Sequence, residues 1–90
     1  MVQIVLASQV SYRPMSASFT LYTRAGCHLC ERVEDLVAVH APECRLVDVD
    51  TAPNLEQAYG LRVPVFVCGD RVLLEGQIEE RDLIQAIRQA

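Results

Sequence analysis

Residues Phe19–Cys30 read FTLYTRAGCHLC and carry the strongest local structural signal in the chain. The first five of them, Phe19–Thr23, are mostly apolar, aromatic or β-branched and predict a buried strand. A short Arg-Ala-Gly turn follows, and a Cys-x-x-Cys pair, Cys27 and Cys30, then opens an amphipathic helix. A strand, a tight turn and a helix that begins at two cysteines are the arrangement expected of a reactive dithiol.

The size and composition of the chain indicate one globular domain. Its 90 residues leave no room for a second core, and a domain of this size buries roughly 60–65% of the surface that its unfolded chain exposes. The hydrophobic content of 51% and charged content of 22% are typical of a folded protein. The net charge of −4 argues against nucleic acid as a partner. No segment approaches the ~20 apolar residues of a membrane span, so we expect no membrane partner.

The N-terminal residues 1–17 are the least informative part of the sequence. Val2, Ile4 and Leu6 alternate as a strand does, but polar residues and Pro14 soon end the pattern. We predict a poorly ordered extension before a domain at residues 18–90, with an added edge strand as the alternative. The sequence shows no basic N-terminal region and no clear cleavage site that would indicate a secretory signal. We therefore expect a cytoplasmic protein whose cysteines are reduced, catalytic or metal-binding.

Hydrophobic periodicity predicts the remaining elements. It favours helices over residues 29–40, about 51–59 and 79–89, and strands over residues 45–49, 63–67 and 71–74. A right-handed crossover makes the first two strands parallel, and a tight turn at Gly69 and Asp70 makes the last two antiparallel. We therefore predict an α/β fold of order βαβ-α-ββα, with a four-stranded mixed sheet flanked by three helices.

The two cysteines of the motif are expected to play different roles. Cys27 lies where the turn passes into the helix, so unpaired backbone N–H groups and the positive end of the helix dipole face its sulfur. Both stabilise the thiolate, which is the form that attacks disulfides. Cys30 lies one turn inward and should be more buried. We assign Cys27 as the nucleophile and Cys30 as the resolving thiol.

Two basic residues near Cys27 are expected to tune its thiolate. A protonated His28 beside the sulfur would stabilise the anion and make the pair more oxidising, whereas a neutral, solvated turn residue is the alternative. Arg24 adds fixed positive charge three residues before Cys27, unless it is an ordinary turn cation. Glu31 and Glu34 would oppose the effect, but their positions indicate the outer face of the helix.

Metal ligation and a merely structural cysteine pair are the alternatives to redox chemistry. A structural zinc site needs four ligands, usually from a second close pair, and the sequence has no second Cys-x-x-Cys. In the predicted topology Cys44 and Cys68 lie at the opposite end of the sheet from Cys27. The first strand separates Cys44 from Cys68. We expect them to be free thiols, and we expect no metal at the dithiol.

Pro64 follows Val63 at the start of an apolar strand, a position that proline occupies only in special backbone situations. If the third strand runs antiparallel beside the first, Pro64 lies next to Cys27. A cis peptide bond would then leave the backbone of Val63 facing the dithiol, although the residues alone leave the isomer open.

At this point residues 18–89 resemble a glutaredoxin. The resemblance rests on Tyr-Thr-Arg-Ala-Gly-Cys-His-Leu-Cys, on Val63 and Pro64, and on Gly76 before the last helix. Cys-His-Leu-Cys, with Val-Asp-Val-Asp at 47–50 and Arg-Val-Pro-Val at 62–65, is more closely similar to small bacterial glutaredoxin-like proteins. This implies a thioredoxin-like fold of the glutaredoxin type with Pro64 cis.

The resemblance also implies roles for the residues around the dithiol. Arg24 matches the basic position that contacts a carboxylate of glutathione, and Val63 matches the residue whose backbone pairs with the bound thiol peptide. Arg62, however, stands where glutaredoxins carry threonine, and Glu75-Gly76 replaces their Gly-Gly pair. The glutamate brings bulk and negative charge toward an anionic tripeptide, which argues against glutathione as the substrate.

These observations predict an enzyme, a thiol-disulfide oxidoreductase that acts on protein or small-molecule thiols and disulfides. The expected substrate-binding residues are Arg24, Arg62, Val63, Pro64 and Gly76. No cofactor is expected to be permanently bound, and glutathione or a thioredoxin reductase is a candidate redox partner. The alternatives are an iron–sulfur or metal-binding protein that uses Cys27, and a redox-inert interaction module of the same fold.

Overall fold

The computed structural model describes residues 18–90. Its elements are β1 (Phe19–Thr23), α2 (His28–His40), β2 (Arg45–Asp48), the 3₁₀ helix η1 (Val49–Thr51), α3 (Pro53–Tyr59), β3 (Val65–Cys68), β4 (Arg71–Glu75) and α4 (Glu80–Gln89). The predicted order βαβ-α-ββα is confirmed. The predicted N-terminal extension, and its alternative as an edge strand, lie outside the described residues. No helix among residues 18–90 is long and apolar enough to cross a membrane.

The four strands form one mixed sheet of order β2-β1-β3-β4. Strand β1 runs parallel to β2 and antiparallel to β3, and β3 and β4 are antiparallel. This confirms the predicted sheet. Tyr22, near the end of β1, pairs with Val65, the first residue of β3. The turn that leads to Cys27 and the segment that contains Pro64 therefore lie at the same end of the sheet.

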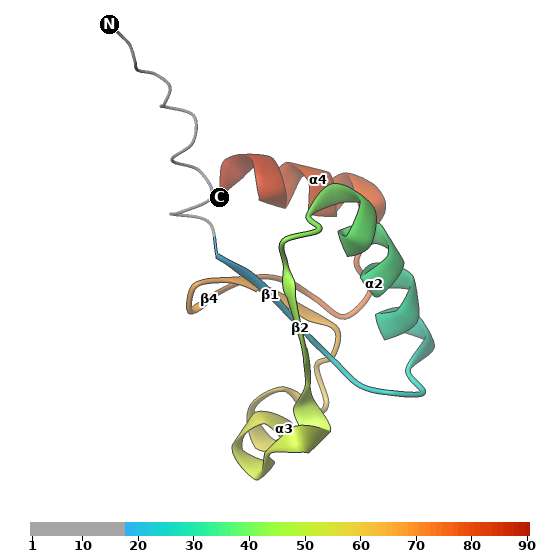
Figure 1. Ribbon diagram of the computed structural model, residues 1–90, viewed down its shortest axis with the longest axis vertical. Helices are drawn as coiled ribbons and strands as arrows, with labels where there is room; N and C mark the ends of the chain where they lie inside the picture. Colours follow the sequence, from blue (N-terminus) through green and yellow to red (C-terminus); the bar gives the residue numbers. More distant parts are fainter. Residues whose placement is uncertain (1–17) are drawn as a thin grey trace, which may run out of the picture.

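The hydrophobic core lies between the sheet and the two longer helices. Alternate residues of β1 point inward, and the rings of Phe19 and Phe66 stack with their centroids 5.1 Å apart. Helix α2 contributes Val33 and Val37, and α4 contributes Leu83. Because burial of these apolar side chains removes them from water, it holds both helices against one face of the sheet (Figure 1). His40 Nε2 of α2 also lies within hydrogen-bonding distance of Glu80 Oε2 of α4, at 2.7 Å.

Helix α3 packs on the other face of the sheet. Tyr22 follows the buried Leu21 along β1, so its side chain points to the opposite face. The ring of Tyr22 stacks on that of Tyr59 in α3, with 4.2 Å between the centroids and 14° between the planes. In Figure 1, α3 lies apart from α2 and α4. The stacking holds α3 near the end of β1 that carries the dithiol.

Four strand boundaries differ from the sequence prediction: β3 and β4 each end one residue later than predicted, and the start of β3 and the end of β2 have a clear local cause. Strand β3 begins at Val65, two residues later than predicted, and Pro64 before it has no backbone N–H to donate to a neighbouring strand. Strand β2 ends at Asp48 because the chain turns there into η1. The carboxylate of Asp48 accepts a hydrogen bond from the backbone N–H of Asp50 at 2.9 Å, and the Thr51 hydroxyl donates to the Asp48 carbonyl at 2.7 Å.

Candidate dithiol site

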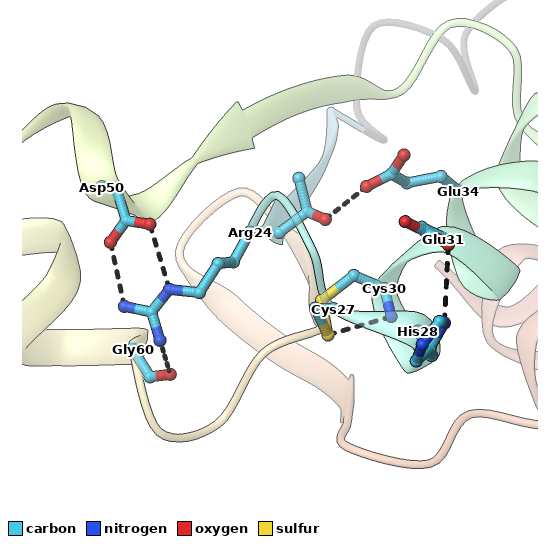
Figure 2. Close-up of a disulfide and its surroundings, with 9 residues drawn as sticks. Arg24, Cys27, His28, Cys30, Glu31, Glu34, Asp50 and Gly60 are labelled. Carbon is cyan, nitrogen blue, oxygen red and sulfur yellow. Dashed lines mark hydrogen bonds and ion pairs between the residues drawn. A yellow bond between two sulfur atoms is a disulfide. The ribbon is translucent and has the colours of Figure 1, made fainter.

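Cys27 and Cys30 are joined by a disulfide, with their Cα atoms 5.1 Å apart (Figure 2). Cys27 is the N-cap residue of α2, and its Sγ accepts a hydrogen bond from the backbone N–H of Cys30 at 3.2 Å. Cys27 is partly exposed, whereas Cys30 is fully buried. A reagent from solution can therefore reach Cys27 and not Cys30.

The turn before Cys27 depends on Gly26. This residue has a φ of +78°, in the left-handed region that glycine adopts without the strain a Cβ atom would cause. The chain thereby reverses from β1 into α2, whose first helical bond runs from the Glu31 N–H to the Cys27 carbonyl at 3.0 Å. As a result Cys27 occupies the end of the helix where backbone N–H groups point outward.

The segment around Pro64 lies at the same end of the sheet as the dithiol. The Val63–Pro64 peptide bond is cis, as the resemblance implied. The backbone N–H of Gly76, which has a φ of +75°, donates to the Pro64 carbonyl at 2.9 Å. Among residues 18–90, neither backbone polar group of Val63 has a hydrogen-bond partner. Val63 thus retains an acceptor and a donor for an extended chain.

Arg24 lies in the turn before Cys27, as expected from the sequence. Its guanidinium is bound to other parts of the protein (Figure 2). Its Nε donates to Asp50 Oδ2 at 3.1 Å and its Nη2 to Asp50 Oδ1 at 2.9 Å. Its Nη1 donates to the Gly60 carbonyl at 3.0 Å, and Glu56 lies 3.6 Å from Nη2. Arg24 therefore ties the turn before the dithiol to η1 and α3.

Arg62 is engaged in a similar way. Its Nε donates to Glu75 Oε1 at 2.7 Å and its Nη1 to the Ala58 carbonyl at 3.3 Å. The guanidinium carbon lies 5.5 Å from the centroid of the Tyr59 ring, within the range of a cation–π contact. Arg62 thus joins the end of α3 to the end of β4.

Of the other charged residues near the motif, His28 is exposed to solvent and Glu34 is half-buried. The His28 side chain is 98% exposed, and its nearest ionic partner is Glu31, 3.8 Å from Nδ1. Its role in tuning the thiolate stays a prediction. The expectation that Glu34 faces outward is wrong: it is half-buried, and the hydroxyl of Thr23 donates to its carboxylate. The cause is the end of β1, which lies beside this turn of α2.

Cys44 and Cys68 are both free, as predicted. Both pack against the edge of the hydrophobic core, and burial raises the pKa of the Cys44 thiol to about 11. Among residues 18–90, no group of three or more His, Cys, Asp or Glu side chains is placed to hold a metal ion. The dithiol is thus accompanied by arginine–carboxylate pairs and not by a second set of metal ligands in the described part of the chain.

Sequence reasoning missed the partners of the two arginines. Asp50, Glu56 and Tyr59 come from η1 and α3, which are remote in sequence from the Cys-x-x-Cys motif. One signal was available for Asp50, since it closes the Asp-Val-Asp run that follows the second strand. Nothing local indicated that Arg24 would pair with it, because the pairing depends on how α3 packs against β1.

The fold and the dithiol define a thioredoxin-like protein of the glutaredoxin type. The chain belongs to the family described as glutaredoxin-like domain (DUF836), whose model matches residues 18–88. No curated protein matches it in sequence. Among solved structures, the structural-genomics target protein XcR50 from X. campestris is 35% identical, with a TM-score of 0.72. The match covers 81% of this chain and 99% of that one.

More distant structures share the fold. The glutaredoxin grx-1 from Archaeoglobus fulgidus is 22% identical, with a TM-score of 0.61, over 86% of this chain and 92% of that one. A mutant thioredoxin from Halobacterium salinarum NRC-1 is 23% identical, with a TM-score of 0.60, over 98% of this chain and 86% of that one. These likenesses confirm the predicted fold class.

Proposed function

We propose that the protein is a thiol-disulfide oxidoreductase in which Cys27 is the nucleophile and Cys30 the resolving thiol. The observation that carries the proposal is the disulfide between a partly exposed Cys27 at the start of α2 and a fully buried Cys30. Exposure of one sulfur and burial of the other give the two cysteines distinct access to a substrate. The expected cytoplasmic location is part of this proposal.

The geometry supports a stepwise exchange. In the reduced protein, the backbone N–H of Cys30 and the start of α2 would stabilise a Cys27 thiolate. This thiolate attacks a substrate disulfide, which forms a mixed disulfide and releases one substrate thiolate. Cys30 then attacks Cys27 Sγ, and the second substrate thiolate leaves. Two electrons pass from the dithiol to the substrate, and the protein returns to the disulfide form.

The segment at Val63 and Pro64 supports binding of an extended substrate. The unpaired backbone groups of Val63 lie at the same end of the sheet as Cys27. A chain that lay antiparallel to this segment could pair with Val63 while presenting its sulfur to Cys27. Gly76, whose N–H donates to the Pro64 carbonyl, holds this segment in place.

A redox titration combined with thiol alkylation tests the proposal. We expect Cys27 and Cys30 to form a reversible disulfide, and Cys27 of the reduced protein to alkylate faster at neutral pH than free cysteine does. The variant Cys30→Ser should accumulate a mixed disulfide with substrate, whereas Cys27→Ser should form none. The proposal would be falsified if no reversible disulfide formed and Cys27 alkylated like an ordinary thiol. Visible absorption after anaerobic purification would instead favour the iron–sulfur alternative.

A further inference from the structure

The arginine nearest the dithiol along the chain is not available to an anionic substrate. Arg24 gives Nε and Nη2 to both carboxylate oxygens of Asp50, and Nη1 to the carbonyl of Gly60. Glu56 adds a second carboxylate at 3.6 Å. A substrate carboxylate would have to displace a two-bonded ion pair of this chain, which is the strongest geometry an arginine offers.

Arg62, the second arginine of the site, is also paired with a carboxylate of this chain. Arg62 donates to Glu75 at 2.7 Å, and Glu75 ends β4 immediately before Gly76. The two arginines therefore face three carboxylates, those of Asp50, Glu56 and Glu75, which leaves this group with a net charge of −1 (two minus three). The site thus favours cationic groups in a substrate over anionic ones.

Exposed apolar side chains lie close in sequence to Val63 and between the two cysteines. Leu61, two residues before Val63, is fully solvent-exposed at 101%. Leu29, between the two cysteines, is 43% exposed. A small polar tripeptide offers little to cover these leucines, whereas a protein segment carries side chains that can.

From these features we propose a substrate class for the dithiol, and this proposal rests on the function proposed above. The substrates are cysteines in protein segments that carry basic residues next to the cysteine. The backbone of Val63 pairs with the segment, the carboxylates of Asp50, Glu56 and Glu75 attract its basic residues, and the leucines contact its apolar ones. Glutathione, an anionic tripeptide, is disfavoured at the same site. The reduced dithiol donates two electrons to the protein disulfide, which leaves as two thiols.

Single-turnover oxidation of the reduced protein tests this proposal. Four disulfides are compared by acid quenching and mass spectrometry: neutral hydroxyethyl disulfide, glutathione disulfide, and two matched short peptides with the cysteine flanked by Arg or by Glu. Rates are normalised to hydroxyethyl disulfide, which cancels differences in the intrinsic reactivity of the dithiol. We expect the Arg peptide to react about tenfold faster than the Glu peptide and glutathione disulfide at low salt, and the gap to narrow at about 0.5 M NaCl.

A charge variant isolates the contribution of the site. Glu75→Gln removes one carboxylate and releases Arg62, so the normalised rate with glutathione disulfide should rise and that with the Arg peptide should fall. Glu43→Gln makes the same charge change just before β2, at the opposite end of the sheet, and should leave both rates unchanged. Glu56→Gln serves as a second site variant if Glu75→Gln does not fold.

The outcomes separate the two proposals. If none of the four disulfides oxidises the dithiol, the oxidoreductase function itself fails. If hydroxyethyl disulfide reacts but glutathione disulfide or the Glu peptide matches the Arg peptide, the function stands and the substrate class is wrong. Equal effects of Glu75→Gln and Glu43→Gln would also overturn the substrate class, because they would show a response to total charge alone.

Discussion

Arg24 and Asp50 form a two-bonded ion pair, with Nε 3.1 Å from Oδ2 and Nη2 2.9 Å from Oδ1. Arg24 belongs to the turn that leads to Cys27, and Asp50 belongs to η1. The hydrogen bond that Arg24 donates to Asp50 raises the pKa of the guanidinium above its ordinary value. The arginine therefore stays charged throughout the pH range in which a thiol reacts, and it acts as a tie between segments.

Loss of this tie should loosen η1 without unfolding the protein. In Asp50→Asn the two-bonded ion pair is lost, while the contacts of Arg24 with Gly60 and Glu56 remain. We therefore expect amide hydrogens of η1 to exchange several-fold faster while those of the core strands keep their rates, since exposed ion pairs contribute little to global stability. Hydrogen exchange read by mass spectrometry measures this. Asp70→Asn, in the β3–β4 turn, is the control. Unchanged exchange in η1 of Asp50→Asn would contradict the assigned role.

Leu21 and Leu46 offer a matched test of where the core lies. They are direct neighbours in the β1–β2 pairing, but Leu21 is fully buried and Leu46 is 53% exposed. Leu21→Ala should lower the free energy of unfolding by about 2–5 kcal/mol, because it removes buried methyl groups and leaves a cavity. Leu46→Ala should cost less than ~1 kcal/mol. Urea denaturation of both variants measures the difference, and similar losses would mean that the Leu46 side chain is buried as well.

Cys44 should resist alkylation and make stability depend on alkaline pH. Burial, aided by Glu43, raises the pKa of this thiol from 9.0 to about 11. In the folded protein at pH 9 only a small fraction of Cys44 is therefore thiolate, against about half in the unfolded chain, whose thiol pKa is 9.0. Because the unfolded state loses this proton first, the contribution of Cys44 to stability is complete below pH 9 and disappears as pH rises through about 11.

Unfolding midpoints measured between pH 8 and 11 test this dependence. Cys44→Ala should flatten the part of the pH profile that lies between the two pKa values. Cys68→Ala, which removes the other free thiol, is the comparison. A Cys44 that alkylates in the folded protein as rapidly as in urea would show that the thiol is not shielded.

Gly76 should tolerate asparagine better than alanine. Its φ of +75° strains any residue with a Cβ atom, although a Cβ at this position would meet no atom within 4 Å. Gly76→Ala should therefore cost about 1–2 kcal/mol from backbone strain alone. Gly76→Asn should recover part of this, since asparagine adopts the left-handed region more readily. Thermal unfolding ranks the two variants, and the reverse order would point to steric contacts instead of strain.

Leu61 should matter for binding and not for folding. The side chain is fully exposed, so Leu61→Ser should leave the unfolding midpoint unchanged. If it contacts protein substrates, the oxidation rate with a peptide disulfide that carries apolar residues should fall several-fold, while that with hydroxyethyl disulfide stays the same. Val39→Ser, at an exposed position near the end of α2, is the matched control. Equal peptide rates for both variants would remove Leu61 from the binding surface.

Much of the fold was predictable because its signals are local. The alternation in Phe19–Thr23 and the spacing of apolar residues in α2 indicate which side chains of these elements are buried. The turn at Gly69 and Asp70 has a characteristic composition, and the handedness of crossovers orders the first two strands. Two of the strand boundaries that differ lie at Pro64 and Asp48, where a missing N–H and a side-chain hydrogen bond override the apolar pattern.

The sequence by itself determined the strand–turn–helix unit, the position of Cys27 at a helix start and the burial of Cys30, because these depend on residues within a few positions of one another. Tertiary structure alone decided what surrounds the dithiol. Arg24 and Arg62 look like free cations in the sequence, yet the packing of α3 beneath Tyr22 brings Asp50, and the end of β4 brings Glu75, to neutralise them. An ion pair between segments 26 positions apart has no local signature, since it forms only when both segments are held in place by the same sheet.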